Sequence, residues 1–452
     1  MLITLAAPAF AGTWYIENGD ITVKASGTEG KNKVSQGNNP EVEDTDTIIT
    51  NQKTDTASSH TVTIDAGNDK VEVTLKDVNI DTSSRNKAAV SVTGSGNTTI
   101  KLDGDNHLTG GNGIYSNSSG SLTISGDEND SLTAQGGDSR NGIYSVSGDV
   151  TISGGTVTAT GGNSTGSYGS GGDGIHSGSL TISGGTVTAT GGDSTGSNGL
   201  GGRGICSDSG GITISGGSTV TANGGNGSSG RDGISSSSGV TVSDGTVTAT
   251  GGNSTGSYGS GGDGIRSGDI DLSGSLELTA KAGSPNGKAL SQRGNELDLN
   301  TIKDKLGPGA KVTTTDADGK VNQVPIPGPV EPEEPVIPEE SSSSSDGGSA
   351  TPSAPASSLP GLTVTDKSGA VISYTSTQSG NTLTVCVGRF AASLRASLST
   401  LRQLRAEGIE TITFQTILCS TTLSVDELLA MGAEDAEAVL THRSTDSSLT
   451  VG

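Results

Sequence analysis

Aromatic residues are scarce in this chain: phenylalanine, tryptophan and tyrosine make up 2% of its 452 residues. Hydrophobic residues of all kinds reach only 29%, whereas glycine occurs 73 times. So little bulky apolar material is not enough for one large globular core, and composition alone favours disorder or a low-complexity fibre. A repeat protein avoids this limit, because each repeat shares a thin core with its neighbours.

Basic residues, cysteines and long apolar runs are also few. The formal charge is −23, from 26 Lys+Arg against 49 Asp+Glu, which disfavours nucleic acid and anionic lipid as partners. No run of eighteen apolar residues occurs, so we expect no membrane insertion. Three cysteines do not make a disulfide framework. Cys386 and Cys419 either pair or serve as small buried hydrophobes.

The N-terminal sequence "MLITLAAPAFAGTWY" resembles the end of a secretory signal peptide. Its apolar stretch from Leu2 to Ala7 precedes Ala9-Phe10-Ala11, a small-x-small cleavage site. We therefore predict a signal-peptide remnant over residues 1–11, a mature start at Gly12 and secretion. The alternative is a frayed apolar N-terminus.

The middle of the chain repeats itself. "TISGGTVTATGG" stands at 151–162 and again at 181–192, and a 21-residue run at 155–175 returns unchanged at 245–265. A Gly-Ile pair marks each repeat, at intervals of 29, 32, 30, 29 and 31 residues. The glycines of these pairs are Gly113, Gly142, Gly174, Gly204, Gly233 and Gly264.

Each interval holds three short runs in which apolar and polar residues alternate, the period of a strand with one buried face. In one repeat, Ile143, Val150 and Val157 would point inward, and Tyr144 and Thr158 outward. Three strands per turn with glycine at the corners predict an all-β, right-handed parallel β-helix, whose like residues stack about 4.8 Å apart. Irregular, more charged sequence after residue 268 is expected to cap the stack.

Composition divides the chain further. We assign residues 12–321 to the β-helix, the Pro/Glu/Ser-rich residues 322–360 to a linker and residues 361–452 to a small α+β domain. In the last domain, Leu394, Leu398, Leu401 and Leu404 predict a helix that ends at Gly408. Ser424 and Glu427 predict a capping box for a second helix.

The runs "GIYSVSGDVTISGGTVTATGG" and "TTIKLDGDNHLTGG" resemble secreted bacterial parallel β-helix proteins of the carbohydrate-binding-domain-containing type. This resemblance covers roughly residues 13–310, and its motifs belong to the scaffold rather than to a site. The fold is shared with polysaccharide lyases and surface adhesins. The resemblance therefore implies a polysaccharide or glycan partner at the cell surface or in the surrounding matrix.

Two sets of aromatic residues are candidates for carbohydrate binding. Tyr115, Tyr144 and His176 each follow a Gly-Ile pair, so they should form a flat outward ladder on consecutive coils. Tyr168 and Tyr258 occupy equivalent places in long loops three coils, about 14 Å, apart. The alternative is that all five residues are isolated surface side chains.

We expect no catalytic site. Arg140, Arg203, Arg231 and Arg266 fall at turns or singly, and most acidic residues lie at turns, where they serve backbone geometry. No histidine has a metal-like partner at short spacing, so no metal site is assigned. Two other functions stay open: a structural or adhesive spacer, and ice binding by the Thr-x-Thr-x-Thr columns, although threonine is also an ordinary exposed strand residue.

Polar residues also flank the base of each loop between the third strand and the next Gly-Ile pair. No cofactor is assigned to them, although Ca²⁺ is a possible ligand because Asp, Asn and glycine carbonyls are hard oxygen donors. The sequence instead favours clasps that close each loop, because Arg203 stands where a metal ligand would be needed. The pairs are Asp138 with Asn141, Asn163 with Asp173, Asp193 with Arg203, Asn226 with Asp232, and Asn253 with Asp263.

Overall fold

The computed structural model describes residues 12–28, 30–307 and 309–325, together with residues 362–451 except 367–370, 373, 380, 388, 390, 417–419, 432–435 and 444–445. The signal-peptide remnant, Cys419 and most of the linker lie outside the described residues. The chain divides into two compact units, Met1–Val330 and Glu331–Gly452. No helix among the described residues is long and apolar enough to cross a membrane.

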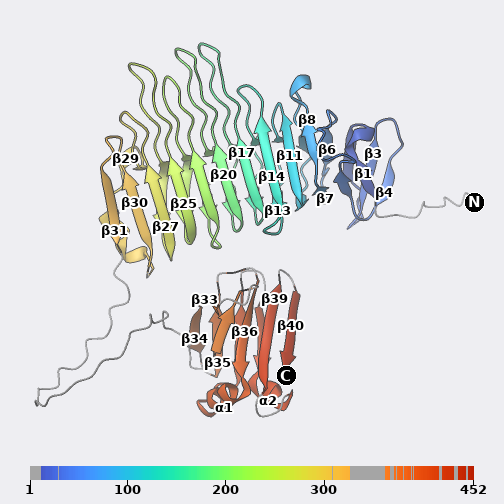
Figure 1. The fold of residues 1–452 in the computed structure, drawn as a ribbon, viewed down its shortest axis with the longest axis vertical. Helices are drawn as coiled ribbons and strands as arrows, with labels where there is room; N and C mark the ends of the chain where they lie inside the picture. Colours follow the sequence, from blue (N-terminus) through green and yellow to red (C-terminus); the bar gives the residue numbers. More distant parts are fainter. Residues whose placement is uncertain are drawn as a thin grey trace, which may run out of the picture. The chain divides into compact units, whose positions relative to one another are not determined.

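The first unit is a parallel β-helix, as the repeats predict (Figure 1). Each complete coil contributes a strand, or part of a long strand, to each of three parallel ladders. The first ladder begins each coil, after the Gly-Ile glycine. It contains β2 (Ile21–Ala25), β6 (Val62–Asp65), β9 (Val90–Thr93), β12 (Ile114–Ser116), β15 (Ile143–Ser145), β18 (Ile175–Ser177), β21 (Ile205–Ser207), β24 (Ile234–Val242), β26 (Ile265–Leu272) and β28 (Leu290–Gln292).

The second ladder follows in the same coils, and β24 and β26 are long enough to belong to both ladders. Its other strands are β1 (Thr13–Tyr15), β5 (Ile48–Thr50), β7 (Val71–Lys76), β10 (Thr98–Asp103), β13 (Leu122–Ser125), β16 (Val150–Ile152), β19 (Leu180–Ile182) and β22 (Ile212–Ile214).

The third ladder forms the row of arrows from which the long loops rise in Figure 1. It consists of β8 (Asn79–Asp81), β11 (Asp105–Gly110), β14 (Ser131–Gly136), β17 (Thr156–Thr160), β20 (Thr186–Thr190), β23 (Thr219–Asn223), β25 (Gly245–Thr250), β27 (Leu276–Lys281) and β30 (Lys311–Thr315).

Antiparallel strands cover the ends of two of these ladders, where a bare parallel edge would invite pairing with another chain. At the N-terminal end, β3 (Asn32–Gln36) pairs with β2, and β4 (Val42–Asp44) pairs with β3. At the C-terminal end, β29 (Asn295–Glu296) pairs with β28, and β31 (Val321–Pro325) with β30. The predicted C-terminal cap is therefore confirmed.

The core is a set of columns of like residues. Ile143 lies between Ile114 and Ile175 in the first ladder, and all three side chains are fully buried. Val157 and Ala159 of β17 face inward on copies of themselves, Val187 and Ala189 of β20. Each coil therefore needs only a few small apolar side chains, which explains how a chain with 29% hydrophobic residues folds.

Backbone approaches backbone at the corner after the third strand, where two glycines stand in most coils. A Cβ added to Gly192 would lie 2.1 Å from the carbonyl oxygen of Gly162, and one on Gly162 would lie 1.7 Å from that of Gly137. Both distances are far inside van der Waals contact, and glycine is the residue that permits such contact. The glycine repeats are thus a steric requirement of the stack.

The loop bases differ from the predicted clasps. Asp193 and Arg203 form no ion pair in the described part of the chain; instead, the carboxylate Oδ1 of Asp193 accepts a hydrogen bond of 2.6 Å from the backbone N–H of Asn226, one coil away. Asn226 Oδ1 accepts in turn from Asn253 N–H at 2.8 Å, and Asn253 Oδ1 from Ser284 N–H at 2.9 Å. The prediction of clasps is wrong because each side-chain oxygen points along the stack rather than across its own loop. There, the next coil presents a backbone N–H group at the equivalent position.

A second such chain of hydrogen bonds runs just before the Gly-Ile pairs. Asn141 Oδ1 accepts from Asp173 N–H at 2.7 Å, and Asp173 Oδ1 accepts from Arg203 N–H at 2.6 Å. Arg203 has no acceptor oxygen, so the chain stops there and resumes with Asp232, which accepts from Asp263 N–H at 2.8 Å. These side-chain oxygens therefore accept hydrogen bonds from backbone N–H groups of the next coil. In the Ca²⁺ alternative they would have been ligands of the metal ion instead.

Among its described residues, the second unit contains two sheets and two helices. One sheet has the strand order β33-β32-β36-β39-β40 and the other β34-β35-β37-β38. Their bounds are β32 (Leu362–Thr365), β33 (Val371–Ile372), β34 (Thr375–Ser379), β35 (Thr382–Cys386), β36 (Ala391–Ser397), β37 (Thr411–Gln415), β38 (Ser420–Ser424), β39 (Glu437–Arg443) and β40 (Asp446–Val451), with the helices α1 (Leu398–Ala406) and α2 (Val425–Met431).

The predicted helices are present, with one correction. Leu394 lies in β36 rather than in the helix, because the Ser397 hydroxyl caps α1 by accepting a hydrogen bond from Thr400 N–H and thereby sets the helix start at Leu398. Gly408, at a φ of 93°, follows the end of α1 as predicted. Ser424 accepts the backbone N–H of Glu427 at the start of α2.

We predict that Gly202→Ala strongly destabilises the β-helix, because the added Cβ would lie 1.8 Å from the carbonyl oxygen of Gly172. Overpacking of this kind costs about 1–3 kcal/mol, and a backbone clash leaves little room for relaxation. Urea unfolding of the two proteins measures the loss. Gly166→Ala is the matched control, because its Cβ would meet nothing closer than 3.6 Å. Equal stability of Gly202→Ala and wild type would refute the steric account.

Candidate functional site

The outward residues of the first ladder form one row, here called the ladder-one row. The strand register pairs Tyr115 with Tyr144, Tyr144 with His176 and His176 with Cys206. It continues through Ser235 to Arg266. The prediction that Tyr115, Tyr144 and His176 lie on consecutive coils of one face is confirmed in its geometry.

The three rings do not form the flat ladder that the sequence predicts. The centroids of Tyr115 and Tyr144 are 5.7 Å apart and the ring planes meet at 52°. Tyr144 and His176 have centroids 5.0 Å apart at 75°, an edge-to-face contact that the ring quadrupoles favour. His176 takes this orientation because two carboxylates, rather than the tyrosine, hold its ring.

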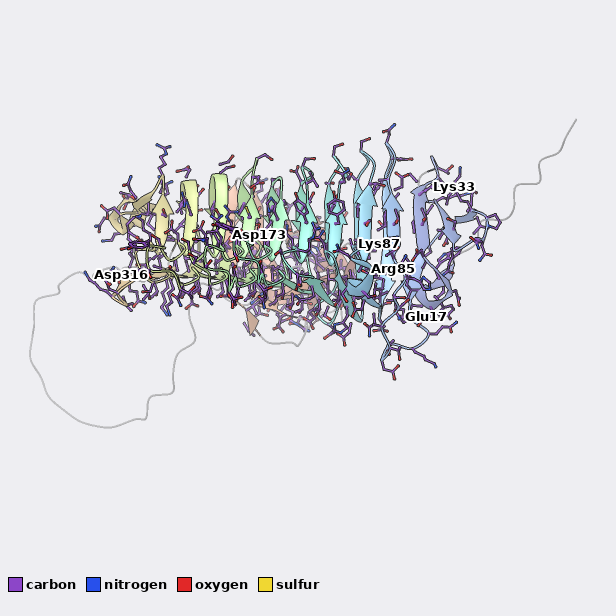
Figure 2. All side chains as sticks on the ribbon, turned by 90° about the horizontal axis from the view of Figure 1, so that it is seen from above. Glu17, Lys33, Arg85, Lys87, Asp173 and Asp316 are labelled. Carbon is purple, nitrogen blue, oxygen red and sulfur yellow. The ribbon has the colours of Figure 1, made fainter. Side chains whose placement is uncertain are left out.

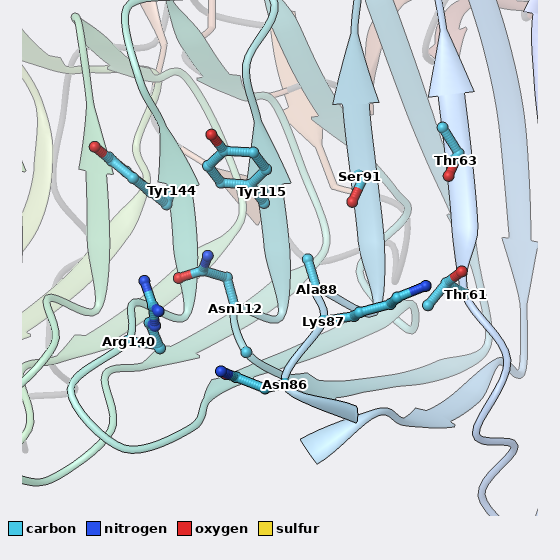
Figure 3. A pocket seen from close by; sticks show the side chains of 11 residues that line it. Thr61, Thr63, Asn86, Lys87, Ala88, Ser91, Asn112, Tyr115, Arg140 and Tyr144 are labelled. Atoms are coloured by element: carbon cyan, nitrogen blue, oxygen red, sulfur yellow. The ribbon is translucent and has the colours of Figure 1, made fainter. Parts of the chain in front are cut away.

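Tyr115 and Tyr144 line a hollow of about 480 Å³, here called the tyrosine pocket (Figure 3). In Figure 3 both rings rise from neighbouring strands, with Asn112 and Arg140 at their base. Both rings are half-buried, so each is braced by its surroundings and still presents a face. The other residues that line the pocket are Thr61, Thr63, Asn86, Lys87, Ala88, Ser91 and Gly111.

Tyr168 and Tyr258 lie elsewhere. Their relative exposures are 82% and 103%, on long loops that leave the third ladder. Neither residue lines the tyrosine pocket, and neither makes an aromatic contact in the described part of the chain. The structure therefore separates the two predicted aromatic sets.

The threonine columns of the third ladder are also in register. Thr156 pairs with Thr186, Thr186 with Thr219 and Thr219 with Thr246. This regular array faces outward on a different ladder from the tyrosines, and its role in ordering water stays a prediction.

His176 lies between two carboxylates. Its Nδ1 is 2.8 Å from Asp173 Oδ2, and its Nε2 is 2.8 Å from Asp208 Oδ2. Figure 2 places Asp173 over the middle coils of the β-helix. A neutral imidazole has only one N–H, so both contacts are hydrogen bonds only when the ring is protonated. Burial alone would lower the pKa of His176, but Asp173 and Asp208 outweigh it and raise that pKa.

A sulfur atom completes this cluster. One ligand atom each from Asp173, His176 and Cys206 lies within 4.8 Å of the others, a grouping that could hold a metal ion. The expectation that no histidine has a metal-like partner at short spacing is wrong for His176, because Asp173 stands only three residues before it. A metal would have to replace a proton on the imidazole, and burial raises the pKa of the Cys206 thiol to about 12. The arrangement therefore shares a proton between His176 and the two carboxylates in the absence of a metal, whereas a bound metal would replace that proton and take the Cys206 thiolate as a ligand.

A second hollow, of about 390 Å³, adjoins Cys206 and is here called the arginine pocket. Four arginines line it: Arg203, Arg231, Arg266 and Arg293. Arg203 and Arg231 lie at turns, as expected, and Arg266 lies in β26. The three are nevertheless not isolated, because residues 28 and 35 positions apart become neighbours when coils stack. The repeat interval is the sequence signal from which this cluster of arginines could have been predicted.

Comparison with known protein families, with curated proteins and with solved structures gives no match for this chain.

We predict that stability falls as the pH rises through the pKa of His176. That pKa is raised in the folded state, so the stabilisation is fully present below about pH 6.5, the ordinary value, and is lost as the pH passes the folded-state pKa. Calorimetry at stepped pH should show a steeper loss of Tm for wild type than for His176→Gln. His107→Gln, which removes an exposed histidine of β11, should keep the wild-type slope. Identical slopes for wild type and His176→Gln would contradict the prediction.

Proposed function

We propose that this chain is a secreted, non-catalytic glycan-binding protein of the cell surface or the surrounding matrix. The observation that carries the proposal is the tyrosine pocket, where Tyr115 and Tyr144 stand on adjacent coils within one hollow. Tyrosine rings suit the apolar face of a pyranose, and their hydroxyl groups stay available for hydrogen bonds. The signal-like N-terminal sequence and the resemblance to β-helix proteins of the carbohydrate-binding-domain-containing type support secretion and the ligand class.

The polar rim of the pocket fits the same ligand. Asn86, Asn112 and Thr61 offer amide and hydroxyl groups of both hydrogen-bonding senses, as sugar hydroxyls require. Lys87 and Arg140 add two cations to the lining of the pocket, and in Figure 3 the Lys87 side chain points toward Thr61. A few polar groups that converge around an aromatic surface are typical of small-molecule sites.

The rival function is a structural or adhesive spacer, favoured by the regular stack of coils and its covered ends. A spacer depends on length and stability and needs no pocket. A glycan array separates the two functions, since a spacer binds none of the plant, host or bacterial glycans displayed.

For a glycan found on that array, we predict that Tyr144→Ala weakens binding by about 1–3 kcal/mol, the usual loss when an aromatic stacking platform is removed. Isothermal titration calorimetry measures the change. Tyr258→Ala is the comparison, because it removes an equally large ring from a loop tip. Unchanged affinity in Tyr144→Ala together with weaker binding in Tyr258→Ala would move the site to the loops.

A further inference from the structure

The arginine pocket concentrates positive charge in a chain whose formal charge is −23. Its four arginines come from four successive coils: Arg203 and Arg231 precede β21 and β24, Arg266 lies in β26, and Arg293 follows β28. Since coils repeat at about 4.8 Å, the four side chains come from successive levels along the axis of the β-helix and meet at one pocket.

Most of this charge has no partner within the protein. Arg293 Nε donates a hydrogen bond of 3.0 Å to the carbonyl oxygen of Gly268. Toward the other residues that the structure describes, the guanidinium groups of Arg203, Arg231 and Arg266 form neither a hydrogen bond nor an ion pair. Arg203 Nε is fully buried without an acceptor. A charged group that lacks hydrogen-bond partners is costly to bury, so an oxyanion bound at the accessible side of this guanidinium would stabilise it.

The described carboxylates at the pocket make no ion pair with the arginines. Burial opposes the charge of Arg203, but Cys206, Asp173, Asp232 and Asp208 outweigh burial and raise the pKa of Arg203, so its charge is balanced in part through space. Asp208 is bound to the His176 imidazole at 2.8 Å. Asp232 is 5% exposed and its Oδ1 accepts Asp263 N–H, so it belongs to the hydrogen-bond chain along the stack. Burial, followed by the charge of Arg203, lowers the pKa of Arg231, and the opposing charges of Asp232 and Asp173 do not cancel that effect.

We propose that the arginine pocket binds the carboxylate or sulfate groups of an acidic glycan. Guanidinium forks match the geometry of such oxyanions, which they bind through paired charge-assisted hydrogen bonds. The proposal rests on the proposed function, because the arginine pocket and the tyrosine pocket lie along the ladder-one row. Tyr144 pairs with His176, His176 with Cys206, Cys206 with Ser235 and Ser235 with Arg266.

This arrangement specifies how the ligand would lie. The tyrosine pocket and the arginine pocket are separated by the coil of His176, so a chain of several sugars along the axis would reach both. The aromatic end would hold sugar rings and the cationic end their acidic groups. A neutral glycan would bind only at the tyrosine pocket, and a small inorganic anion only at the arginine pocket.

The test compares an Arg203→Gln/Arg231→Gln variant with an Arg402→Gln/Lys303→Gln control, which removes two exposed positive charges outside the pocket. Titration calorimetry uses four probes: a polyuronate, dextran sulfate, neutral dextran and inorganic sulfate. We expect the pocket variant to bind an acidic polymer at least tenfold more weakly than wild type, and the control to bind it as wild type does. The comparison of polyuronate with dextran sulfate assigns the acidic group.

Thermal unfolding accompanies each titration. The variant keeps the backbone hydrogen bonds of the stack and loses side chains that make no hydrogen bond or ion pair with the described residues, so its Tm should stay close to that of wild type, and loss of binding is then not loss of fold. Equal binding of both acidic polymers by wild type and variant overturns the proposal, whereas the proposed function stands if either polymer binds. Failure of wild type to bind any of the four probes overturns it as well. Binding of inorganic sulfate that disappears in the variant supports the pocket even where no glycan binds and the proposed function fails.

Discussion

Adjacent coils lie about 4.8 Å apart because parallel strands pair at that spacing, and the whole β-helix depends on keeping that spacing at its corners as well as in its strands. Where Gly162 follows Gly137 and Gly192 follows Gly162, a single methyl group would strike a carbonyl oxygen of the coil below. The glycine corners therefore hold the register, and the register decides which side chains become neighbours. The isoleucine core, the asparagine and aspartate hydrogen bonds and the ladder-one row all follow from it.

The sequence repeat makes much of the coil arrangement predictable. A period near 30 with three alternating runs predicts three ladders, and a common position after Gly-Ile predicts that Tyr115, Tyr144 and His176 share a face. The repeat period alone does not determine the direction in which a side chain points. Asp193 could turn across its loop or along the stack, and only the constant supply of backbone N–H groups along the stack decides this. The tilt of the rings and the start of α1 at Leu398 likewise depend on local hydrogen bonds.

The clustering of the arginines is hidden in the sequence for a related reason. In the sequence, Arg203, Arg231 and Arg266 are isolated cations in an acidic chain, whereas in the structure they share one hollow. Stacking converts a residue that recurs once per repeat into a cluster, and the same rule brings Asp208 to His176. On one face the ladder-one row thus changes from aromatic, through a protonated imidazole held by two carboxylates, to cationic. That gradient suits a ligand that is itself part apolar and part anionic.

The central claim is that the ladder-one row is the ligand-binding face. Hydrogen–deuterium exchange with and without a saturating acidic glycan tests it most directly. The account predicts slower exchange at the strands of the row, β12, β15, β18, β21, β24 and β26, and at the turns that carry Arg203 and Arg231. It predicts unchanged exchange along the threonine columns of β17, β20 and β25. Protection confined to those threonine columns or to the Tyr168 and Tyr258 loops would contradict it.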